Sequence, residues 1–170
     1  MHRGFTLLEL LITVSVLTAL LLFLSPNFSN VTQQTKIVNL ANEIHGFLIQ
    51  AKSEAVLRNQ DLWVHLDGLP ASDGKWTLTL STVSTSSAVS TANTLAVFEG
   101  YRYRNLWVSN TGSLVSVKFD HVMGNPLEAG NISIKLSETD PNPVKVVIHN
   151  RAGRIKLCTV REAKYGFEKC

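Results

Sequence analysis

The first feature of the hydrophobic pattern is a long apolar run near the start of the chain. Between residues 5 and 24, the polar positions are Thr6, Glu9, Thr13, Ser15 and Thr18. A helix of about twenty residues, rising about 1.5 Å per residue, covers roughly the 30 Å of a bilayer's hydrocarbon. The pattern therefore predicts a membrane-spanning helix over residues 5–25. A cleaved secretory signal is the alternative, although no A-x-A cleavage site follows the run.

A second helical pattern follows, and its apolar residues lie on one face only. They recur at steps of three and four residues, at Val31, Ile37, Leu40, Ala41, Ile44, Leu48, Ala51 and Ala55. Polar residues fill the other face, which predicts an amphipathic helix packed on a core over residues 26–60. This helix should end near Asn59. Because Pro26 lacks a backbone donor, it should kink or loosen the chain between the two helical segments.

After Gln60 the period of the pattern changes from that of a helix to that of a strand. The predicted strands are residues 62–66, 75–80, 94–98, 105–108, 114–119, 131–136, 144–149 and 153–160. Alternating strands bury one face and form antiparallel sheets. We therefore predict an α+β fold, in which a β-rich domain over residues 61–170 is covered on one face by the amphipathic helix. The Ser- and Thr-rich residues 81–94 should form a mobile loop or a hairpin tip.

Two short segments between these elements have alternative interpretations. In residues 101–107, strand spacing would place Arg102 and Arg104 on one face and Tyr101 and Tyr103 on the other. Interleaved aromatic and basic side chains can stack nucleic-acid bases, but a half-buried strand with solvated charges gives the same pattern. Gly153 is suited to the turn through which the strand at 144–149 reverses into the last strand.

Charge changes the picture at the C-terminal end. The chain of 170 residues has a net charge of +3, whereas residues 151–170 contain six basic and two acidic residues, a net charge of +4. The basic residues that we single out are Arg151, Arg154, Lys156, Arg161 and Lys164. A phosphate backbone is the natural anionic partner of such a patch, and double-stranded DNA is the candidate. A solvated surface without a ligand is the alternative.

Candidate chemistry is otherwise sparse. Cys158 and Cys170 would pair in an oxidising compartment, and two unrelated buried thiols are the alternative. The five histidines form no metal-binding motif, and neither a P-loop nor a nucleophile elbow is present. We therefore expect no metal, no cofactor and no enzymatic activity.

Glu9 is the most unusual residue of the apolar run, since an unpaired carboxylate within a bilayer costs several kcal/mol. Hydration near the cytoplasmic face would relieve that cost. The segment "RGFTLLEL" resembles the class III signal of type IV pilins and of the pseudopilins of type II secretion. The resemblance implies that a prepilin peptidase cleaves after Gly4, removing the leader 1–4, and methylates Phe5. It also implies that Glu9 pairs with the amino group of a neighbouring subunit's Phe5 during assembly.

Three later segments are similar to the GspH/FimT type of minor pilins and minor pseudopilins. They are "AKSEAVLRNQDLWVHL" (51–66), "VKFDHVMGNP" (117–126) and "VVIHNRAGRIKLC" (146–158). The resemblance implies a pilin-like fold, a long N-terminal helix on an antiparallel sheet. Some members of this type bind DNA through a C-terminal Gly-Arg-x-Arg-like motif. Here Lys156 takes the second arginine position after Gly153 and Arg154, which keeps the charge but loses the forked geometry.

From these observations we expect a minor pilin that primes or caps a type IV pilus, with DNA capture for natural transformation at its basic end. The expected partners are other pilin subunits, the prepilin peptidase, the inner membrane and double-stranded DNA. His2 and Arg3 precede the apolar run, so the C-terminal domain should lie in the periplasm. One alternative is a minor pseudopilin of a type II secretion system. Another is a DNA receptor whose place in a filament is incidental.

Overall fold

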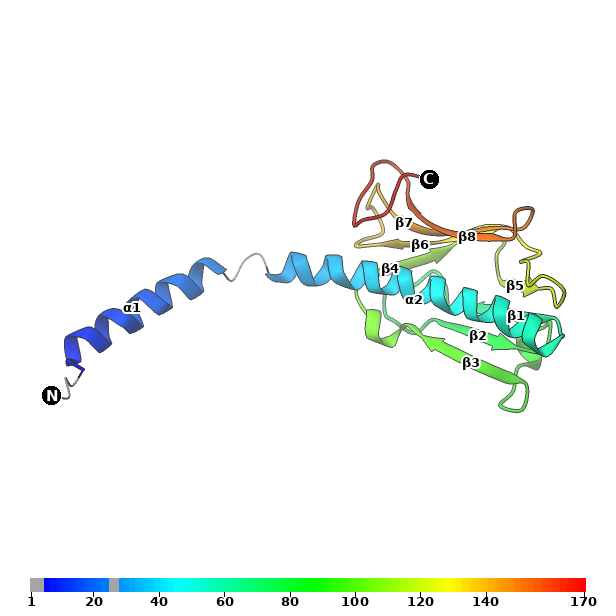
Figure 1. Ribbon diagram of the computed structural model, residues 1–170, viewed down its shortest axis with the longest axis horizontal. Coiled ribbons are helices and arrows are strands. Elements are labelled where there is room, and N and C mark those ends of the chain that lie inside the picture. Colours follow the sequence, from blue (N-terminus) through cyan, green and yellow to red (C-terminus); the bar gives the residue numbers. More distant parts are fainter. Residues whose placement is uncertain (1–4, 25–27) are drawn as a thin grey trace. The chain divides into compact units, whose positions relative to one another are not determined.

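The computed structural model describes residues 5–24 and 28–170. It divides into two compact units, Met1–Thr35 and Lys36–Cys170, which are described separately. The predicted leader 1–4 and the predicted kink at Pro26 lie outside the described residues. Figure 1 shows the two helices in blue and cyan and the strands in green to red.

The apolar run forms α1, Leu7–Leu24. Three of its polar interruptions bond within the helix, since the hydroxyls of Thr13, Ser15 and Thr18 donate to carbonyls three or four residues earlier. Every described side chain from residue 5 to residue 21 is exposed. Within the described residues, no helix has both the length and the apolar character needed to cross a membrane. The predicted span over 5–25 extends past the last described residue of α1, and it stays a prediction.

The amphipathic segment forms α2, Phe28–Arg58. From Lys36 onward its apolar face is buried, with Leu40, Ile44 and Leu48 fully covered. The helix ends one residue before the predicted position. Asn59 adopts a left-handed φ of 50°, the Asn59 N–H bonds to the Val56 carbonyl, and the Gln60 N–H bonds to the Ala55 carbonyl. This pair of bonds is a Schellman motif, which satisfies carbonyls that the helix end would leave free.

All eight predicted strands are found within the described residues. They are β1 Leu62–Asp67, β2 Thr77–Ser81, β3 Thr94–Glu99, β4 Trp107–Asn110, β5 Ser116–Phe119, β6 Gly130–Lys135, β7 Val144–His149 and β8 Arg154–Thr159. The predicted α+β fold, a long helix packed on antiparallel β-structure, is confirmed. The strands form two antiparallel sheets, in the orders β3-β2-β1-β5 and β4-β6-β7-β8. Alternation fixes which face of each strand is buried, but not which strands pair.

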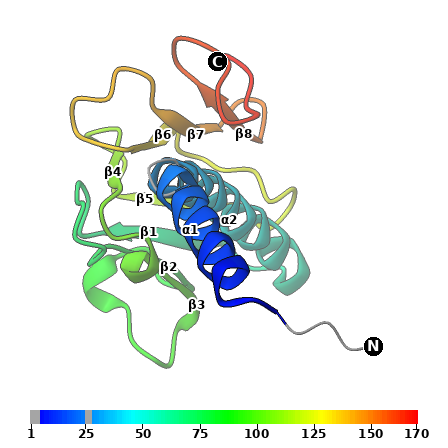
Figure 2. The same ribbon diagram turned by 90° about the vertical axis from the view of Figure 1, so that its left-hand side faces the viewer.

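The helix α2 packs against both sheets. Figure 2 shows it in the angle between them, with β6, β7 and β8 on one side and β1, β2 and β3 on the other. Buried residues from the helix and from both sheets form a single core. At one end of this core, the Phe98 ring centroid lies 6.0 Å from that of Phe47, 5.8 Å from that of Trp76 and 6.4 Å from that of Tyr103.

Two connections near β3 test the remaining predictions. Residues 82–93 link β2 to β3 as a hairpin closed by the Thr82 N–H bond to the Asn93 carbonyl, which confirms the hairpin tip. The strand interpretation of the Tyr–Arg segment is wrong, because Gly100–Tyr103 form a 3-10 turn. Gly100, the first residue of this turn, packs on the Trp76 indole, where an added Cβ would lie 2.3 Å from Cε2, so only glycine fits there. Tyr103 is buried and Tyr101 is exposed.

Candidate functional site

The first candidate region is the beginning of α1. Phe5 is exposed, and Thr6 precedes the first helical residue. The Glu9 N–H donates to Thr6 Oγ1 at 3.3 Å, so Thr6 is the N-cap and Glu9 lies at the third helical position. The pattern Thr-x-x-Glu is that of a capping box, and it was visible in the sequence although only Glu9 was singled out. Gly4 lies outside the described residues.

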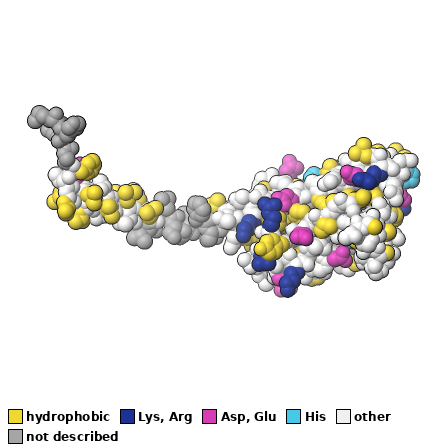
Figure 3. Space-filling view, turned by 90° about the horizontal axis from the view of Figure 1, so that it is seen from below, with side chains coloured by type: hydrophobic (Ala, Val, Ile, Leu, Met, Phe, Trp, Pro, Cys, Tyr) yellow, Lys and Arg dark blue, Asp and Glu magenta, His cyan; other side chains and the backbone are white. Residues whose placement is uncertain are grey.

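This cap gives Glu9 a local role besides the predicted pairing between subunits. A carboxylate in the first turn is stabilised by the partial positive charge of the helix N-terminus, typically by about 0.3–1 kcal/mol. No salt bridge to Glu9 occurs within the part of the chain that the structure describes. Figure 3 shows that mainly hydrophobic side chains cover the described part of α1.

The second candidate region is the basic C-terminal end. In the structure its basic residues form two groups, one at each end of β8. Arg151 and Arg154 lie at the β7–β8 turn and the start of β8, whereas Arg161 and Lys164 follow the end of β8. A strand rises about 3.3 Å per residue, so the five steps from Arg154 to Thr159 alone span roughly 17 Å, and Arg161 and Lys164 lie beyond that end of β8. The five predicted residues therefore do not form one compact cluster.

The sheet adds basic residues that sequence reasoning missed. Val144, Val146 and Ile148 of β7 face the core, so Lys145 and His149 face outward. The β7–β8 register pairs His149 with Arg154 and Val147 with Lys156, and Lys145 is a diagonal neighbour of Lys156. The outer surface of β7 and β8 thus carries Lys145, Lys156, Arg154 and His149, which we call the outer basic face. The alternation of "VKVVIH" signalled Lys145 and His149, but not their partner strand.

No basic side chain of the outer basic face forms a salt bridge with another described residue. In the described residues, salt bridges join Arg58 to Glu54, Lys75 to Asp73, and Lys118 and His121 to Asp61. Each of these pairs lies outside residues 144–170. Cations that carry no carboxylate partner attract anions without first breaking a salt bridge.

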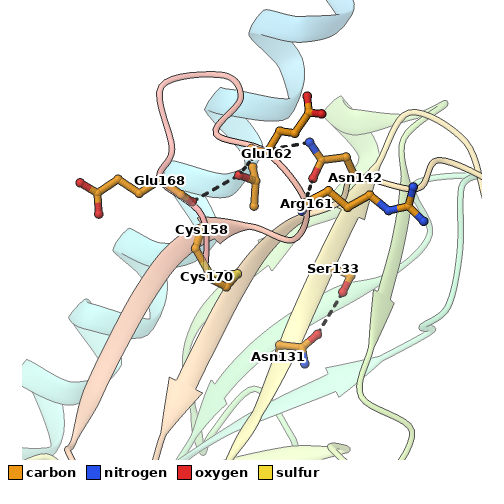
Figure 4. The surroundings of a disulfide bond; sticks show 9 residues. Asn131, Ser133, Asn142, Cys158, Arg161, Glu162, Glu168 and Cys170 are labelled. Atoms are coloured by element: carbon orange, nitrogen blue, oxygen red, sulfur yellow. Dashed lines mark hydrogen bonds between the residues drawn. A yellow bond between two sulfur atoms is a disulfide. The ribbon is translucent and has the colours of Figure 1, made fainter.

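The C-terminal segment is tied back onto β8. Cys158 and Cys170 form a disulfide with a Cα–Cα distance of 5.0 Å, which confirms the predicted pairing (Figure 4). The Thr159 N–H donates to the Glu168 carbonyl at 2.8 Å, and the Cys170 N–H donates to the Thr159 carbonyl at 2.9 Å. The Arg161 N–H donates to Asn142 Oδ1 at 2.9 Å. Arg161 and Lys164 thus stand on a loop closed by both covalent and hydrogen bonds.

Turn geometry positions the arginines at the other end of β8. Gly153 has a left-handed φ of 57°, and an added Cβ there would lie 2.0 Å from Asn125 Oδ1. The Lys52 ammonium donates to the Gly153 carbonyl at 3.0 Å. The predicted role of Gly153 as the turn residue is confirmed, because a side chain would suffer both backbone strain and a clash.

One charged cluster lies away from both candidate regions. Asp61 accepts the Lys118 ammonium and His121 Nδ1, each at 2.7 Å. These two donors, Lys118 first, lower the pKa of Asp61 to about 2. This cluster joins the segment after α2 to β5 and to the loop that follows it. Among the described residues, no group of His, Cys, Asp and Glu is placed to hold a metal ion.

Comparisons with known proteins agree with this architecture. A family model described as type II transport protein GspH matches residues 40–153, and a model of the prokaryotic N-terminal methylation motif matches residues 1–25. Two crystal structures of the type IV minor pilin FimU from Pseudomonas aeruginosa are similar to this chain. Their identities are 20% and 21%, their TM-scores 0.57 and 0.53, and the alignments cover 75% and 71% of this chain and 91% of each FimU chain. No curated protein matches.

Proposed function

The chain belongs to the GspH family of type II transport proteins, and from this premise we propose that it is a minor subunit of a type IV pilus. The observation that carries the proposal is the combination of two parts. An apolar helix, exposed at residues 5–21 and contained in the match to the N-terminal methylation motif, is joined to a folded domain of the GspH type. Such a helix needs apolar surroundings, and a bundle of like helices in a membrane or a filament supplies them.

Processing and assembly follow from the N-terminal segment. The prepilin peptidase cleaves after Gly4 and methylates Phe5, and the helix is anchored in the inner membrane with the C-terminal domain in the periplasm. On assembly, the Glu9 carboxylate meets the amino group of Phe5 in a neighbouring subunit. Two charges that would each be costly in an apolar filament core then form a pair. The work of the protein is structural, and no catalytic step is assigned to it.

Mass spectrometry of the chain extracted from native membranes or filaments tests this assignment. We expect a mature chain that begins with methylated Phe5. In cells, Glu9→Gln should enter filaments less than the wild type, whereas Glu54→Gln, which alters a surface pair on α2, should assemble normally. An intact Met1, or a mature start near Asn30, would contradict the proposal.

A DNA-binding role at the outer basic face is the finer part of the proposal. The unpaired cations Arg154, Lys156 and Lys145 support it, because phosphate binding by such residues needs no prior rearrangement. Arg161 and Lys164 stand too far along the chain to contact the same few phosphates as Arg154, so we assign them to a secondary contact. Lys156 holds phosphate as a point charge.

Fluorescence anisotropy with a duplex oligonucleotide, at two salt concentrations, tests this role on the full chain in detergent. Three phosphate contacts predict a log–log salt slope of about −2.7. The double variant Arg154→Ala/Lys156→Ala should reduce the slope by about 2, because each contact contributes about 0.9. Lys75→Ala, at an exposed site just before β2 of the other sheet, is the matched control. Binding that is absent, or that does not depend on salt, would remove DNA from the proposal.

A minor pseudopilin of a type II secretion system is the second candidate, and the description of the matching family favours it. It predicts loss of protein export on deletion, intact pili, and no salt-dependent DNA binding. A third hypothesis is that the protein is a DNA receptor whose place in a filament is incidental. It predicts that Arg154→Ala/Lys156→Ala abolishes DNA uptake while filaments still form. Filament loss in that double variant would contradict the receptor hypothesis.

A further inference from the structure

The free edges of the two sheets differ in how their backbone groups are satisfied. At β4, the Ala71 N–H donates to the Val108 carbonyl and the Val108 N–H donates to the Ala71 carbonyl, both at 2.9 Å. At β5, the Leu127 N–H donates to the Lys118 carbonyl at 2.9 Å, and the Lys118 N–H donates to a Glu128 carboxylate oxygen at 2.6 Å. Short segments of the chain therefore cover both of these edges.

The edge at β8 is covered by side chains of α2 and by the C-terminal segment. The Lys52 ammonium donates to the Gly153 carbonyl at 3.0 Å, and His45 Nε2 lies 3.2 Å from the Ile155 carbonyl oxygen. Further along β8, Thr159 bonds to Glu168 and Cys170 through backbone groups. Three of the four sheet edges are thus protected in the way that natural proteins protect edges from other chains.

The fourth edge, β3, is open. The Gly100 N–H donates to the Trp76 carbonyl at 2.9 Å, and in an antiparallel ladder such pairs alternate with pairs that do not bond. The register then places Phe98 and Ala96 in bonding pairs with β2, and Val97 and Glu99 in non-bonding pairs. The N–H and C=O groups of Val97 and Glu99 therefore point away from β2. Glu99 is the N-cap of the 3-10 turn Gly100–Tyr103, so its carbonyl accepts the first bond of that turn. No hydrogen bond to the Val97 N–H, the Val97 carbonyl or the Glu99 N–H occurs within the described ranges 5–24 and 28–170.

The side chains of β3 do little to protect this edge. The strand "TLAVFE" contains neither Pro nor Lys, and its one bulge, at Leu95, lies just before the stretch Ala96–Glu99. Val97 is 51% exposed. Lysine, proline and bulges are the usual means of blocking strand addition, so the open stretch of β3 is suited to pairing.

A pocket of about 420 Å³ adjoins the open edge. It is lined by Glu43, Val97, Phe98, Glu99, Tyr101 and Arg102. The lining contains two acidic residues and one basic residue, so its net charge is negative and suits a basic side chain. Burial and the nearby Glu43 carboxylate raise the pKa of Tyr103 to about 12, which keeps the neighbouring phenol neutral. In strand addition, backbone bonds supply affinity and such side-chain pockets supply specificity.

We propose that β3 is a strand-addition site: an extended segment of another protein chain pairs with both backbone groups of Val97 and with the Glu99 N–H, and places a basic side chain in the adjoining pocket. The incoming strand continues the sheet β3-β2-β1-β5 at its open end. Its alternate side chains should be apolar where they follow the row of Ala96 and Phe98. The inference does not depend on filament membership, because it rests on the edge alone.

Selection of peptides tests the proposal directly. A phage-displayed library of random heptapeptides is selected on the full chain in detergent and counter-selected on Val97→Pro. Proline at this position removes one outward N–H and leaves the bonds to β2 in place. We expect enriched heptapeptides with alternating apolar residues and a Lys or Arg, which bind Val97→Pro at least about 10-fold more weakly. Failure to enrich such peptides, or equal binding to Val97→Pro, would overturn the proposal.

N-methylation of one enriched peptide provides the second measurement. A methyl group on the peptide nitrogen that pairs with the Val97 carbonyl should weaken binding, whereas methyl groups on the two neighbouring nitrogens should not, because those N–H groups point away from β3. A profile without alternation would also overturn the proposal. If Val97→Pro does not fold, Val97→Lys replaces it, with Val122→Lys at another exposed valine as the control. Glu99→Lys should shift the selected basic residue to an acidic one.

Discussion

The two long helices of this protein use apolar residues in opposite ways. In α1 the described leucines and valines are exposed on all sides, and values between 52% and 82% are found from Leu7 to Leu21. In α2 the apolar stripe from Ile37 to Ala55 is buried against both sheets. A helix that is apolar all round needs apolar surroundings from outside the chain, whereas a striped helix is stabilised by its own domain. We therefore expect substitutions in α1 to affect assembly and substitutions in α2 to affect folding.

The largest expected effect comes from removing a buried side chain of α2. Leu48→Ala should lower the free energy of unfolding by about 2–5 kcal/mol, because it leaves a cavity at a fully buried position. Leu17→Ala, at an exposed position of α1, should leave the unfolding of the domain unchanged. Chemical denaturation followed by tryptophan fluorescence measures both. Equal destabilisation by the two variants would contradict the division of roles between the helices.

A charge in α1 should have the converse effect. Lysine at the centre of a membrane helix costs about 2.5–3.5 kcal/mol on insertion scales. Leu17→Lys should therefore reduce the amount of chain recovered in membranes and filaments, without changing the melting temperature of the domain. Leu57→Lys, at an exposed position of α2, is the control and should leave recovery unchanged. Immunoblots of membrane and filament fractions measure the recovery of each variant. If Leu17→Lys is recovered as well as the wild type, α1 does not lie in an apolar environment.

The helix caps allow a finer comparison. Thr6→Ala removes the hydroxyl that caps α1 and should cost about 1 kcal/mol of local helix stability. Hydrogen exchange of the amides near Glu9 should then accelerate.

At the end of α2, Asn59→Ala places alanine, which has a Cβ, at a left-handed φ. This substitution should lower the stability of the domain by about 1 kcal/mol. Asn59→Gly should retain stability. If Ala and Gly behave alike at position 59, backbone strain does not control the end of α2.

The smallest expected effect is a dependence on pH at the end of α2. The folded-state pKa of Asp61 is lowered to about 2, below the unfolded value near 3.9. Its contribution to stability is therefore fully present above about pH 4 and is lost as the pH falls through about 2. Acid titration of the unfolding midpoint should show a smaller decline in Asp61→Asn than in the wild type. Parallel curves for the two proteins would show that the Asp61 cluster does not contribute.

Sequence reasoning succeeded where the signal was local. The change of period after Gln60 predicted all eight strands, and the Pro-free apolar stripe predicted α2 to within one residue of its end. It failed at Gly100–Tyr103, where the indole of Trp76 leaves no room for a Cβ at Gly100 and the chain turns. That contact joins residues 24 positions apart, and no local pattern encodes it.

The candidate sites divide in the same way. Glu9 could be singled out because a carboxylate stands alone in an apolar run, and the disulfide could be proposed because the chain has two cysteines. The spatial grouping of the basic residues could not be predicted from the sequence. Adjacency in sequence suggested that Arg154 and Arg161 act together, whereas the register of β7 and β8 places Lys145 beside Lys156 and leaves Arg161 at the far end.

By itself, the sequence determined the helices, the strands, their buried faces and the family, because these depend on local periodicity and short motifs. The tertiary structure alone decided that the strands form two sheets, that α2 covers the free edge of β8, and that β3 is left open. These features depend on pairings between segments distant along the chain. Their energies come from packing and hydrogen bonding between surfaces that exist only after folding.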